Sequence, residues 1–341
     1  MSGDGGVLVV GAGVAGLSCA RALTDAGRAV AVVDRARGVG GRCATRRVEG
    51  QAVDTGVAFL HGRDPAFTAV LESVPATCLS GWPVDVHGSG RPCQPEAFGP
   101  GERRLSYAEG VNAFPRHLAS GLRVRTRAPV ERLDLSGKRS RAVLEGGEAL
   151  EAGTLVLALA PEEAQRLLGS VPEPPGQVAS ALAVLGTARS DAALALAALY
   201  PREAPRPPWQ VSYPEDSSIL QIVSHDSSKR TAPAFLALVC QAHPRWSREH
   251  AEEPLWPDLV LGELARLLGR WALAPVHRHP HRWRYARTDR SAELASPLLF
   301  PLPGGCRLGL CGDRFAPGGG VEAAWISGRA LARRILAEED A

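Results

Sequence analysis

A glycine motif near the amino terminus constrains the fold of this chain more than any other sequence feature. Gly11, Gly13 and Gly16 form the pattern Gly-x-Gly-x-x-Gly. The pattern follows the continuous apolar run Val7–Val10 and precedes Val14–Asp25, a segment rich in good helix formers. The first glycine permits a tight turn, the second lets a pyrophosphate approach the backbone, and the third allows close helix–strand packing. This order of strand, motif and helix predicts a βαβ unit on a parallel sheet.

The residues after this helix complete a nucleotide-binding pattern. Gly27 is placed as a glycine at the helix end, and the apolar run Ala29 to Val33 is expected to form the second strand. Asp34 closes that strand 18 residues after Gly16, where an acid hydrogen-bonds a ribose hydroxyl. A carboxylate at this point disfavours a 2′-phosphate. The free N–H groups and positive dipole end of the helix N-terminus would face the phosphates.

The next glycines distinguish FAD from NAD. Gly40-Gly41-Arg42 follows soon after Asp34, and Asp54-Thr-Gly56 comes after a short gap. This order resembles that of the flavin amine oxidases and related FAD oxidoreductases. In those proteins the glycines pass close to the phosphates and the arginine adds a charge-assisted contact. The alternative interpretation is that Arg42 is a surface charge after a turn.

A second glycine-rich motif lies near the carboxyl terminus. The apolar run Arg307 to Cys311 ends in Gly312 and Asp313, and Gly318-Gly-Gly320 opens a terminal helix over Glu322 to Leu336. In FAD proteins of the same superfamily, such a Gly-Asp pair binds the ribityl and pyrophosphate part of the cofactor. The helix after it points its N-terminus at the pyrimidine edge of the flavin, where its dipole stabilises negative charge. Two remote glycine-rich turns of this kind indicate one long cofactor that spans both.

Composition and charge exclude several other classes. The net charge of the 341-residue chain is only +3, and it has no long basic run, which argues against nucleic-acid binding. No apolar stretch approaches the roughly 20 residues of a membrane helix, and the start lacks the features of a signal peptide. Seven cysteines, none spaced as Cys-x-x-Cys, argue against a disulfide framework or a zinc site. We therefore expect a cytoplasmic protein with no metal, membrane or nucleic-acid partner, and its oligomeric state stays open.

Further elements follow from apolar runs and helical spacing. We expect a helix over Gly110 to Leu118 and another over Asp258 to Trp271, where leucines recur at helical spacing. The other expected strands are Arg123 to Thr126, Thr154 to Ala160, Ala181 to Ala188, Ala192 to Leu199, Ser218 to Val223 and Ala234 to Gln241. High alanine content in the middle of the chain also suits helix, so the strands there are the least distinct. The proline- and glycine-rich residues 76–108 allow only short strands.

Taken together, these segments resemble the renalase-like NAD/FAD-dependent oxidoreductases of the flavin amine oxidase superfamily. The resemblance is specific at the two ends and looser between them, in Ser224–Arg230 and in His281–Ala286. Its clearest segments are VVGAGVAGLSCARAL (9–23), GVGGRCATRR (38–47), DTGVAF (54–59), RDPAF (63–67), CGDRF (311–315) and GGGVEAAWISGRALA (318–332).

The resemblance implies a fold and a domain organisation. The expected fold is α/β, a Rossmann-type FAD-binding domain with an inserted α+β substrate domain, as in p-hydroxybenzoate hydroxylase and the amine oxidases. Residues 1–75, 108–170 and 290–341 would form the FAD-binding domain, and residues 76–107 and 171–289 the substrate domain. The residues predicted to contact non-covalently bound FAD are Gly11, Gly13, Ala15, Gly16, Asp34, Arg35, Gly41, Arg42, Gly56, Val57, Ala58, Val130, Gly312, Asp313, Gly320, Val321 and Ala324.

The resemblance also implies a reaction. Renalases take a hydride from dihydronicotinamides reduced at the wrong ring carbon and pass the electrons to O2, which gives H2O2 and normal NAD(P)+. The chain departs from many bacterial relatives after Asp54, because Gly-Ala-Gln-Tyr-Phe-Thr is replaced by Gly56-Val-Ala-Phe-Leu-His61. In relatives this strand lines the flavin, so the substrate is expected to differ. Proline and glycine are also missing from the segment around Lys229.

The candidates for the substrate face are His61, His225, Trp283 and Arg284. Trp283 and Arg284 suit stacking on or pairing with an aromatic, anionic substrate, although packing explains them equally well. His277, His279 and His281 alternate and so share one face of a strand. A metal site is conceivable there, but a solvated or substrate-facing strand is preferred.

Three functions stay open on the sequence alone. The first is a renalase-like FAD-dependent oxidase, and the second an FAD-dependent amine oxidase or desaturase of another small molecule. The third is a flavin-binding protein without a catalytic role. No Ser-His-Asp or paired-carboxylate arrangement stands out, and a flavin oxidase needs none because the isoalloxazine carries the redox step.

Overall fold

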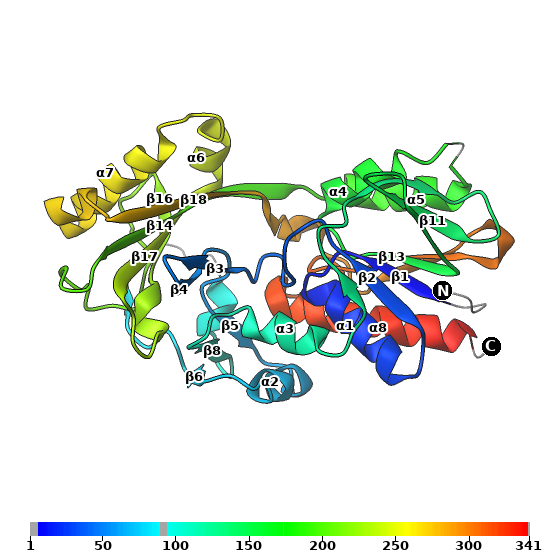
Figure 1. Ribbon diagram of the computed structural model, residues 1–341, viewed down its shortest axis with the longest axis horizontal. Helices are drawn as coiled ribbons and strands as arrows, with labels where there is room; N and C mark the ends of the chain where they lie inside the picture. The colour runs from blue at the N-terminus through cyan, green and yellow to red at the C-terminus, as the bar shows by residue number, and fades with distance from the viewer. Residues whose placement is uncertain (1–5, 89–93, 173, 340–341) are drawn as a thin grey trace. The chain divides into compact units, whose positions relative to one another are not determined.

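The computed structural model describes residues 6–88, 94–172 and 174–339, which fold into two compact units. The first unit comprises the chain up to Gly41, residues 114–190 and the chain from Arg287 onward. The second unit comprises residues 42–113 and 191–286. The chain therefore passes between the units four times, and neither unit is a continuous piece of sequence (Figure 1).

A six-stranded sheet forms the centre of the first unit, in the order β19-β20-β13-β1-β2-β9. All neighbouring strands run parallel except β19, which pairs antiparallel with β20. The predicted βαβ unit is confirmed, since helix α1 (Val14–Asp25) connects β1 to β2. The six strands are β1 (Val7–Val10), β2 (Val30–Val33), β9 (Val124–Arg125), β13 (Thr154–Leu157), β19 (Leu298–Pro301) and β20 (Arg307–Leu310).

Two layers cover this sheet. On one face α1 packs against the terminal helix α8 (Gly320–Glu339), and the Cβ position of Gly328 on α8 meets the carbonyl of Ala15 (Figure 1). On the other face the side chains of Leu8 and Val10 enter a core shared with a small antiparallel sheet and two helices. Those elements are β10 (Val130–Asp134), β11 (Ser140–Leu144), β12 (Ala149–Ala152), α4 (Pro161–Leu168) and α5 (Gly176–Gly186). Helix α3 (Ala113–Ala119) precedes β9.

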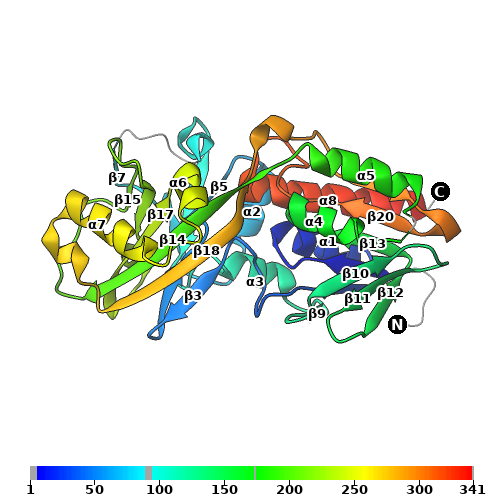
Figure 2. The same cartoon turned by 90° about the horizontal axis from the view of Figure 1, so that it is seen from above.

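The second unit is built on another six-stranded sheet, in the order β18-β14-β17-β16-β15-β7. Strands β14 and β18 are the long ones, with 12 residues each, and Figure 2 shows them running side by side. The strands are β7 (Val86–His87), β14 (Ser190–Pro201), β15 (Val211–Ser212), β16 (Leu220–His225), β17 (Phe235–Ala242) and β18 (His277–Thr288).

Alternating side chains of this sheet enter two different cores. Leu196 and Leu238 pack with residues of α6 (Pro244–Glu249) and α7 (Trp256–Leu268). Ala197 and Val239 instead pack against Val48 and Val53 of the hairpin β3–β4. This hairpin and a small three-stranded sheet lie in the part of the unit before residue 114. Their elements are β3 (Thr45–Val48), β4 (Gln51–Asp54), β5 (Leu60–Gly62), α2 (Pro65–Glu72), β6 (Cys78–Ser80) and β8 (Arg103–Tyr107).

One expectation from sequence needs revision. The strand expected over Ala181 to Ala188 is wrong, because Gly176–Gly186 forms helix α5. Val178, Ala181 and Leu185 are buried at helical spacing, and the alanines favour helix over strand. The expected division into an FAD-binding and a substrate domain stays a prediction; the compact units place residues 42–75 in the second unit and residues 171–190 in the first. The last two changes of unit coincide with the long strands. The chain enters the second unit where β14 begins, at Ser190, and returns to the first near the end of β18, at Thr288.

Candidate cofactor and substrate site

The first glycine motif has the geometry of a phosphate-binding turn. Gly11 has φ +109°, a value that L side chains rarely adopt, and a β-carbon on Gly16 would overlap the carbonyl oxygen of Gly11. Nothing lies within 4 Å of the Cβ position of Gly13, so the backbone there faces open space. Gly13 is also the N-cap of α1 and offers no side-chain hydrogen bond, which leaves the first N–H groups of the helix for an anion.

The second glycine segment joins this turn. Gly13 and Gly40 form a parallel bridge, and the N–H of Gly40 donates to the carbonyl of Ala12 at 2.8 Å. Gly41 has φ +52°, and a β-carbon on it would lie 3.5 Å from the α-carbon of Gly13. The structure thus brings together two of the glycine segments that the sequence assigned to the same phosphates.

Asp34 lies at the carboxyl end of β2, next to the same turn. Its Oδ2 accepts a hydrogen bond from the N–H of Ala12 at 2.6 Å, and its Oδ1 accepts one from the N–H of Ala36 at 2.7 Å. Both carboxylate oxygens are therefore oriented by backbone, and each retains a second lone pair for a hydroxyl donor. This arrangement suits the predicted contact with a ribose.

The carboxyl-terminal motif lies at the same edge of the sheet. Val10, Leu157 and Leu310, the last residues of β1, β13 and β20, are paired directly across the sheet. The turns that follow them therefore emerge side by side. In the last of these turns the N–H of Gly312 donates to Ser327 Oγ at 3.0 Å, and Asp313 Oδ1 accepts from Thr288 Oγ1 at 3.3 Å.

Helix α8 begins at Gly320, immediately after this motif, and three predicted cofactor residues lie in its first turns. Gly320 has φ +71°, Val321 is half-buried and Ala324 is buried. Nothing lies within 4 Å of the Cβ position of Gly320. The start of α8 therefore also presents open backbone.

Two other predicted cofactor residues have structural partners in the first unit. The exposed Arg35 forms an ion pair with Glu163 at 2.5 Å. Val130 is buried in the core, and its carbonyl accepts a hydrogen bond from Arg166 at 3.4 Å. The chain just before it runs beside the nucleotide end, because the N–H of Ala128 donates to the carbonyl of Asp34 at 2.9 Å.

The remaining predicted cofactor residues, Arg42 and Gly56–Ala58, lie in the second unit, where hydrogen bonds fix their backbone. The N–H of Val57 donates to the carbonyl of Arg42 at 3.0 Å, and Gln241 Nε2 donates to the carbonyl of Gly56 at 2.5 Å. A β-carbon on Gly56 would overlap the carbonyl oxygen of Arg42, so glycine is required there. The carbonyl of Ala58 accepts from Lys229 Nζ at 3.0 Å.

Two of the substrate candidates, Trp283 and Arg284, are neighbours on strand β18. Its side chains alternate in exposure, so Trp283 and Arg284 point to opposite faces. Trp283 Nε1 donates to the carbonyl of Thr55 at 2.9 Å, and its ring contacts the Cβ position of Gly56. Trp283 therefore belongs to the Gly56 segment, whereas Arg284 is exposed on the other face.

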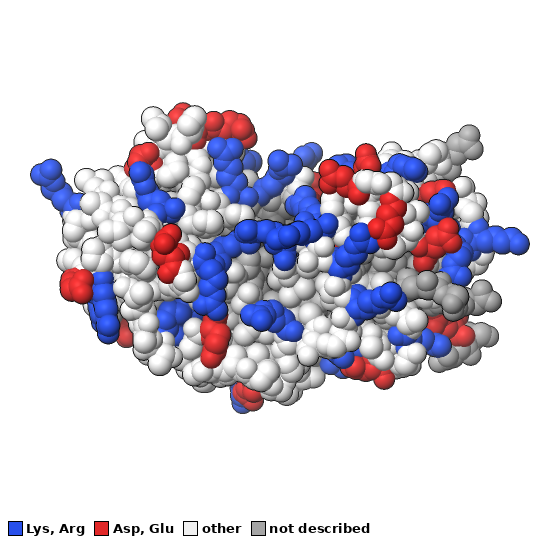
Figure 3. Space-filling view, in the orientation of Figure 1, with Lys and Arg blue, Asp and Glu red and all other residues white. Residues whose placement is uncertain are grey.

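The three alternating histidines share the face of Trp283, as predicted. The rings of His281 and Trp283 lie 4.3 Å apart, centroid to centroid. Burial, Arg46 and His279, in that order, lower the pKa of His281 to about 4. Figure 3 shows Lys and Arg side chains gathered over the β3–β4 hairpin, which carries Arg46. The same hairpin also carries Glu49, whose Oε1 lies 3.9 Å from Nδ1 of His277, so Arg46 and Glu49 approach opposite ends of the histidine row.

The other two histidine candidates lie elsewhere in the second unit. His61 Nδ1 lies 2.6 Å from Oε1 of Glu102, a carboxylate only 2% exposed. This pairing orients the ring of His61. His225 is buried at the end of β16, and burial lowers its pKa. The structure therefore does not gather the four substrate candidates at one point.

Sequence reasoning missed a buried group of four charged residues in the second unit. Asp54, Asp226, Lys229 and Arg230 are joined by ion pairs of 2.6–2.9 Å. In the sequence, the segment Ser224–Arg230 is recognisable only as a point of family resemblance. Its Asp-x-x-Lys-Arg spacing places Asp226 three residues before Lys229 and four before Arg230. That spacing is the sequence signal from which ion pairs within this segment could have been predicted.

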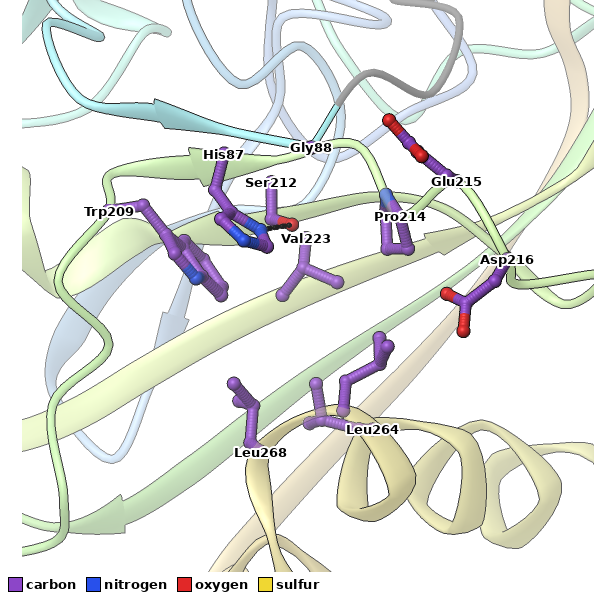
Figure 4. Close-up of a pocket in the computed structure, with 11 residues that line it drawn as sticks. His87, Gly88, Trp209, Ser212, Pro214, Glu215, Asp216, Val223, Leu264 and Leu268 are labelled. Carbon is purple, nitrogen blue, oxygen red and sulfur yellow. Dashed lines mark hydrogen bonds between the residues drawn. The ribbon is translucent and has the colours of Figure 1, made fainter.

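A separate cavity of about 370 Å³ lies between α7 and the β15–β16 edge of the second unit (Figure 4). Trp209, Val223, Leu264 and Leu268 provide apolar walls, and His87 and Asp216 provide polar ones. None of its lining residues is a predicted cofactor or substrate residue, so the cavity does not mark the predicted site.

Two general findings concern the described part of the chain. Among the residues that the structure describes, no group of three or more His, Cys, Asp or Glu side chains is arranged to hold a metal ion. None of the helices described is both long and apolar enough to cross a membrane.

Solved structures with a similar fold cover nearly the whole chain. A putrescine oxidase bound to putrescine has a TM-score of 0.75 at 17% sequence identity, over 98% of this chain and 99% of that one. Cyclohexylamine oxidase from Brevibacterium oxydans IH-35A has a TM-score of 0.73 at 16% identity, over 99% of this chain and 100% of that one. These similarities establish the amine oxidase fold.

Two family matches agree with this fold. Residues 9–74, which hold the first glycine motif and Asp34, match the NAD(P)-binding Rossmann-like domain. Residues 90–336 match the flavin containing amine oxidoreductases, and this match covers well over half of the chain. The protein is therefore a member of the flavin containing amine oxidoreductase family, and its cofactor is FAD.

Proposed function

We propose that this protein is a renalase-like oxidase that binds FAD non-covalently and oxidises a misreduced dihydronicotinamide, 2- or 6-dihydro-NAD(P). When bound, FAD supplies the hydride acceptor at N5 and returns the electrons to O2, which yields H2O2. The protein then contributes binding, orientation and exclusion of competing reactions. Its buried free thiols agree with a reducing, cytoplasmic compartment.

The residues of the first unit fit the nucleotide half of FAD. The open backbone at Gly13 and the uncapped start of α1 would hold the pyrophosphate, and Asp34 would hold the ribose of the adenosine. Gly312, Asp313 and the start of α8 would hold the ribityl and flavin end. Arg42 and the Gly56–Ala58 segment are the proposed contacts from the second unit.

One observation supports a dinucleotide over an alkylamine. The titratable side chains on the same face of β18 as Trp283 are His277, His279, His281 and Tyr285. Arg46 lies close enough to His281, the histidine next to Trp283, to lower its pKa, and the carboxylate of Glu49 lies 3.9 Å from the more distant His277. The charge of Arg46, next to His281, would attract the phosphates of a dinucleotide and repel an alkylammonium ion. Trp283 offers an indole for the nicotinamide or adenine ring to stack on.

The other substrate candidates keep narrower roles under this proposal. Glu102 fixes the orientation of the His61 ring through Nδ1 and leaves Nε2 for a substrate group. Arg284, on the opposite face from Trp283, would act on the phosphates through its charge and not by stacking. His225 is buried with a lowered pKa, which favours a neutral ring.

Amine oxidation is the second candidate. It is favoured by the family match and by the fold shared with putrescine oxidase and cyclohexylamine oxidase. A substrate amine must lose its proton before hydride transfer, so the charge of Arg46 does not forbid it, although it weakens initial capture.

Anaerobic flavin reduction separates the two candidates. The FAD-loaded protein is mixed in a stopped-flow instrument with 2- and 6-dihydro-NAD(P), normal NAD(P)H, putrescine or cyclohexylamine, and the band near ~450 nm is followed. We expect fast bleaching by a misreduced isomer and H2O2 on re-aeration. Bleaching by the amines alone would replace the proposal with the second candidate. Stable FAD with no bleaching by any compound would point to a non-catalytic flavoprotein.

A matched variant tests the observation behind the proposal. Arg46→Gln removes one positive charge beside His281, whereas Arg245→Gln removes an exposed charge on α6 that is paired with Glu249. We expect only Arg46→Gln to raise the KM for the dinucleotide and to reduce its dependence on salt. Equal effects of both variants would argue against a phosphate contact on the β18 face.

A further inference from the structure

Four charges are buried together in the second unit and form what we name the buried charge cluster: Asp54, Asp226, Lys229 and Arg230. The side chains of Asp54, Asp226 and Lys229 are 0% exposed, and that of Arg230 is 5% exposed. Two carboxylates face two cations, so the cluster is neutral as a whole. Charges are buried to this degree only when they are paired and hydrogen-bonded.

Lys229 uses all three of its N–H donors within the cluster and the adjoining backbone. Nζ lies 2.6 Å from Asp54 Oδ2 and 2.7 Å from Asp226 Oδ1, and it donates to the carbonyl of Ala58 at 3.0 Å. Nζ also lies 4.8 Å from the centroid of the Trp82 ring, within cation–π range. Its ammonium therefore has no donor left for a substrate.

Arg230 uses its guanidinium in the same way and joins distant parts of the unit. Nη2 donates to Asp54 Oδ2 at 2.9 Å and to Asp226 Oδ2 at 2.7 Å. Burial opposes its charge, but Asp226 and Asp54 outweigh burial and raise the pKa of Arg230. Its remaining donors go to the backbone carbonyls of Ala52, Tyr107 and Ala108.

Asp54 is the centre of the cluster. Burial alone would raise its pKa, but Lys229 and Arg230, with hydrogen bonds from Lys229 and Thr45, hold the pKa of Asp54 below its ordinary value. Its Oδ1 accepts from Thr45 Oγ1 at 2.6 Å and from the N–H of Val111 at 3.1 Å. The carboxylate therefore stays ionised and binds three separate stretches of chain.

The buried charge cluster forms hydrogen bonds with the backbone at both ends of the segment Asp54–Ala58. The N–H of Asp54 donates to Asp226 Oδ1 at 3.1 Å, and the carbonyl of Ala58 accepts from Lys229. Between these two points Gln241 holds the carbonyl of Gly56. The Oγ1 of Thr55 is buried and has no hydrogen-bond partner in the described structure. An orphan hydroxyl in so constrained a segment points to a partner supplied by a bound group.

We propose that Lys229 is a positioning residue, which with Asp226 and Arg230 fixes the backbone of Gly56–Ala58 against the flavin. This inference rests on the proposed placement of FAD at Gly56–Ala58. Lys229 touches neither cofactor nor substrate in this proposal. It acts through the carbonyl of Ala58 and the carboxylate of Asp54, and so sets the flavin environment that governs reduction.

The first test removes the hydrogen bonds and ion pairs of Lys229 without leaving an unbalanced charge in the cluster. The double variant D226N/K229M removes one negative and one positive charge, and the single variant Q241L releases the carbonyl of Gly56 with the cluster intact. Y200F is the control, because the hydroxyl of Tyr200 is buried and donates to the carbonyl of Ala272, away from the segment. For each FAD-loaded protein we would measure the visible spectrum, the midpoint potential and the anaerobic reduction rate.

We expect D226N/K229M and Q241L to bind FAD with an altered spectrum and midpoint potential and to be reduced roughly ten- to hundredfold more slowly. Y200F should match the wild type in all three. A folded, FAD-loaded D226N/K229M or Q241L variant with wild-type spectrum, potential and rate would overturn the inference. The potential is measured with a chemical reductant, so it reports on the inference even if no dihydronicotinamide reduces the wild type.

A second measurement needs no cofactor. Amide hydrogen exchange of the apoprotein should be faster over residues 54–60 in D226N/K229M than in the wild type, and unchanged in Y200F. If D226N/K229M does not fold, Q241L should still show faster exchange at Gly56 and Val57. Wild-type exchange over residues 54–60 in every folded variant would contradict the positioning role.

Discussion

The carbonyl oxygen of Gly11 occupies the space that a β-carbon on Gly16 would need. Backbone cannot move aside as a flexible side chain can, so we expect Gly16→Ala to force α1 away from β1. Overpacking of this kind costs about 1–3 kcal/mol. The variant should show a lower thermal midpoint without FAD and should bind FAD more weakly than the wild type in a titration.

Gly13→Ala is the matched substitution that separates packing from cofactor binding. Its φ of −74° suits any residue, and nothing lies within 4 Å of the new β-carbon. The apoprotein should therefore keep the wild-type thermal midpoint, whereas FAD affinity measured by titration should fall because the methyl group enters the space proposed for the pyrophosphate. Unchanged FAD affinity in G13A would show that the phosphates do not approach this turn.

His281 should make stability depend on pH. Its pKa in the folded protein is about 4, below the value of roughly 6.5 in an unfolded chain. Between these values the unfolded chain binds a proton that the folded chain does not, so stability falls as pH falls from 6.5 towards 4. Because the ring is half-buried, we expect about 0.5–1 kcal/mol per pH unit. Urea unfolding of H281Q at several pH values should show a flatter profile.

Removal of the neighbouring charge provides the complementary test. Arg46→Gln should raise the pKa of His281 and recover part of the stability lost near pH 5. Two-dimensional NMR of the histidine rings would measure this pKa directly. A pKa of His281 that stays the same in R46Q would mean that burial and His279 lower it without Arg46.

Arg314 should contribute strongly to the stability of the first unit. It is 2% exposed, and it donates to the carbonyls of Val184 and Ala292 and to Thr187 Oγ1. Arg314→Met leaves these acceptors without their donor and should lower the free energy of unfolding by about 2–4 kcal/mol. The control is Arg329→Met on the exposed side of α8, which should change it by less than about 1 kcal/mol. Chemical denaturation curves would compare the two.

The cysteines should differ in reactivity. Of those that the structure describes, Cys78 is exposed, while Cys43 is buried and burial raises its pKa to about 12. Brief alkylation of the native protein, followed by peptide mapping, should therefore label Cys78 and leave Cys43 intact until denaturant is added. Partial burial and then Glu72 raise the pKa of Cys78, so E72Q should speed its labelling. Rapid labelling of Cys43 in the native state would disprove its burial.

The first unit was predictable where local pattern and chemistry agree. Glycines at Gly11, Gly13 and Gly16 follow an apolar run and open a helix, and each physical requirement of that turn appears in the sequence. The strand expected over residues 181–188 is wrong because an alanine-rich apolar run fits the repeat of a buried strand and that of a helix equally well. Packing against the core of the first unit favours the helix. Local signals of that kind do not specify tertiary partners.

The second unit was less predictable because its key contacts are remote in sequence. Asp54 and Lys229 are 175 residues apart, and no local pattern shows that they meet. The alternation of His277, His279 and His281 correctly placed them on one face, but their neighbour Arg46 comes from a different hairpin. The opposite orientations of Trp283 and Arg284 follow from strand periodicity, which could have separated these two candidates from sequence alone.

The order of strands in the first unit also has a consequence for biosynthesis. Strand β1 is made first, yet β13 and β20, which extend its sheet on one side, are completed only at Leu157 and Leu310. On the ribosome the sheet that carries the glycine turn therefore keeps the outer edge of β13 unpaired until Arg307–Leu310 has been translated. Exposed strand edges favour association with other chains, so we expect the edge of β13 to be open to such pairing before β20 arrives. A nascent chain that stalls before Leu310 lacks the Gly312–Asp313 turn altogether, so under the proposed placement of FAD it would lack the contacts to the ribityl part of the cofactor.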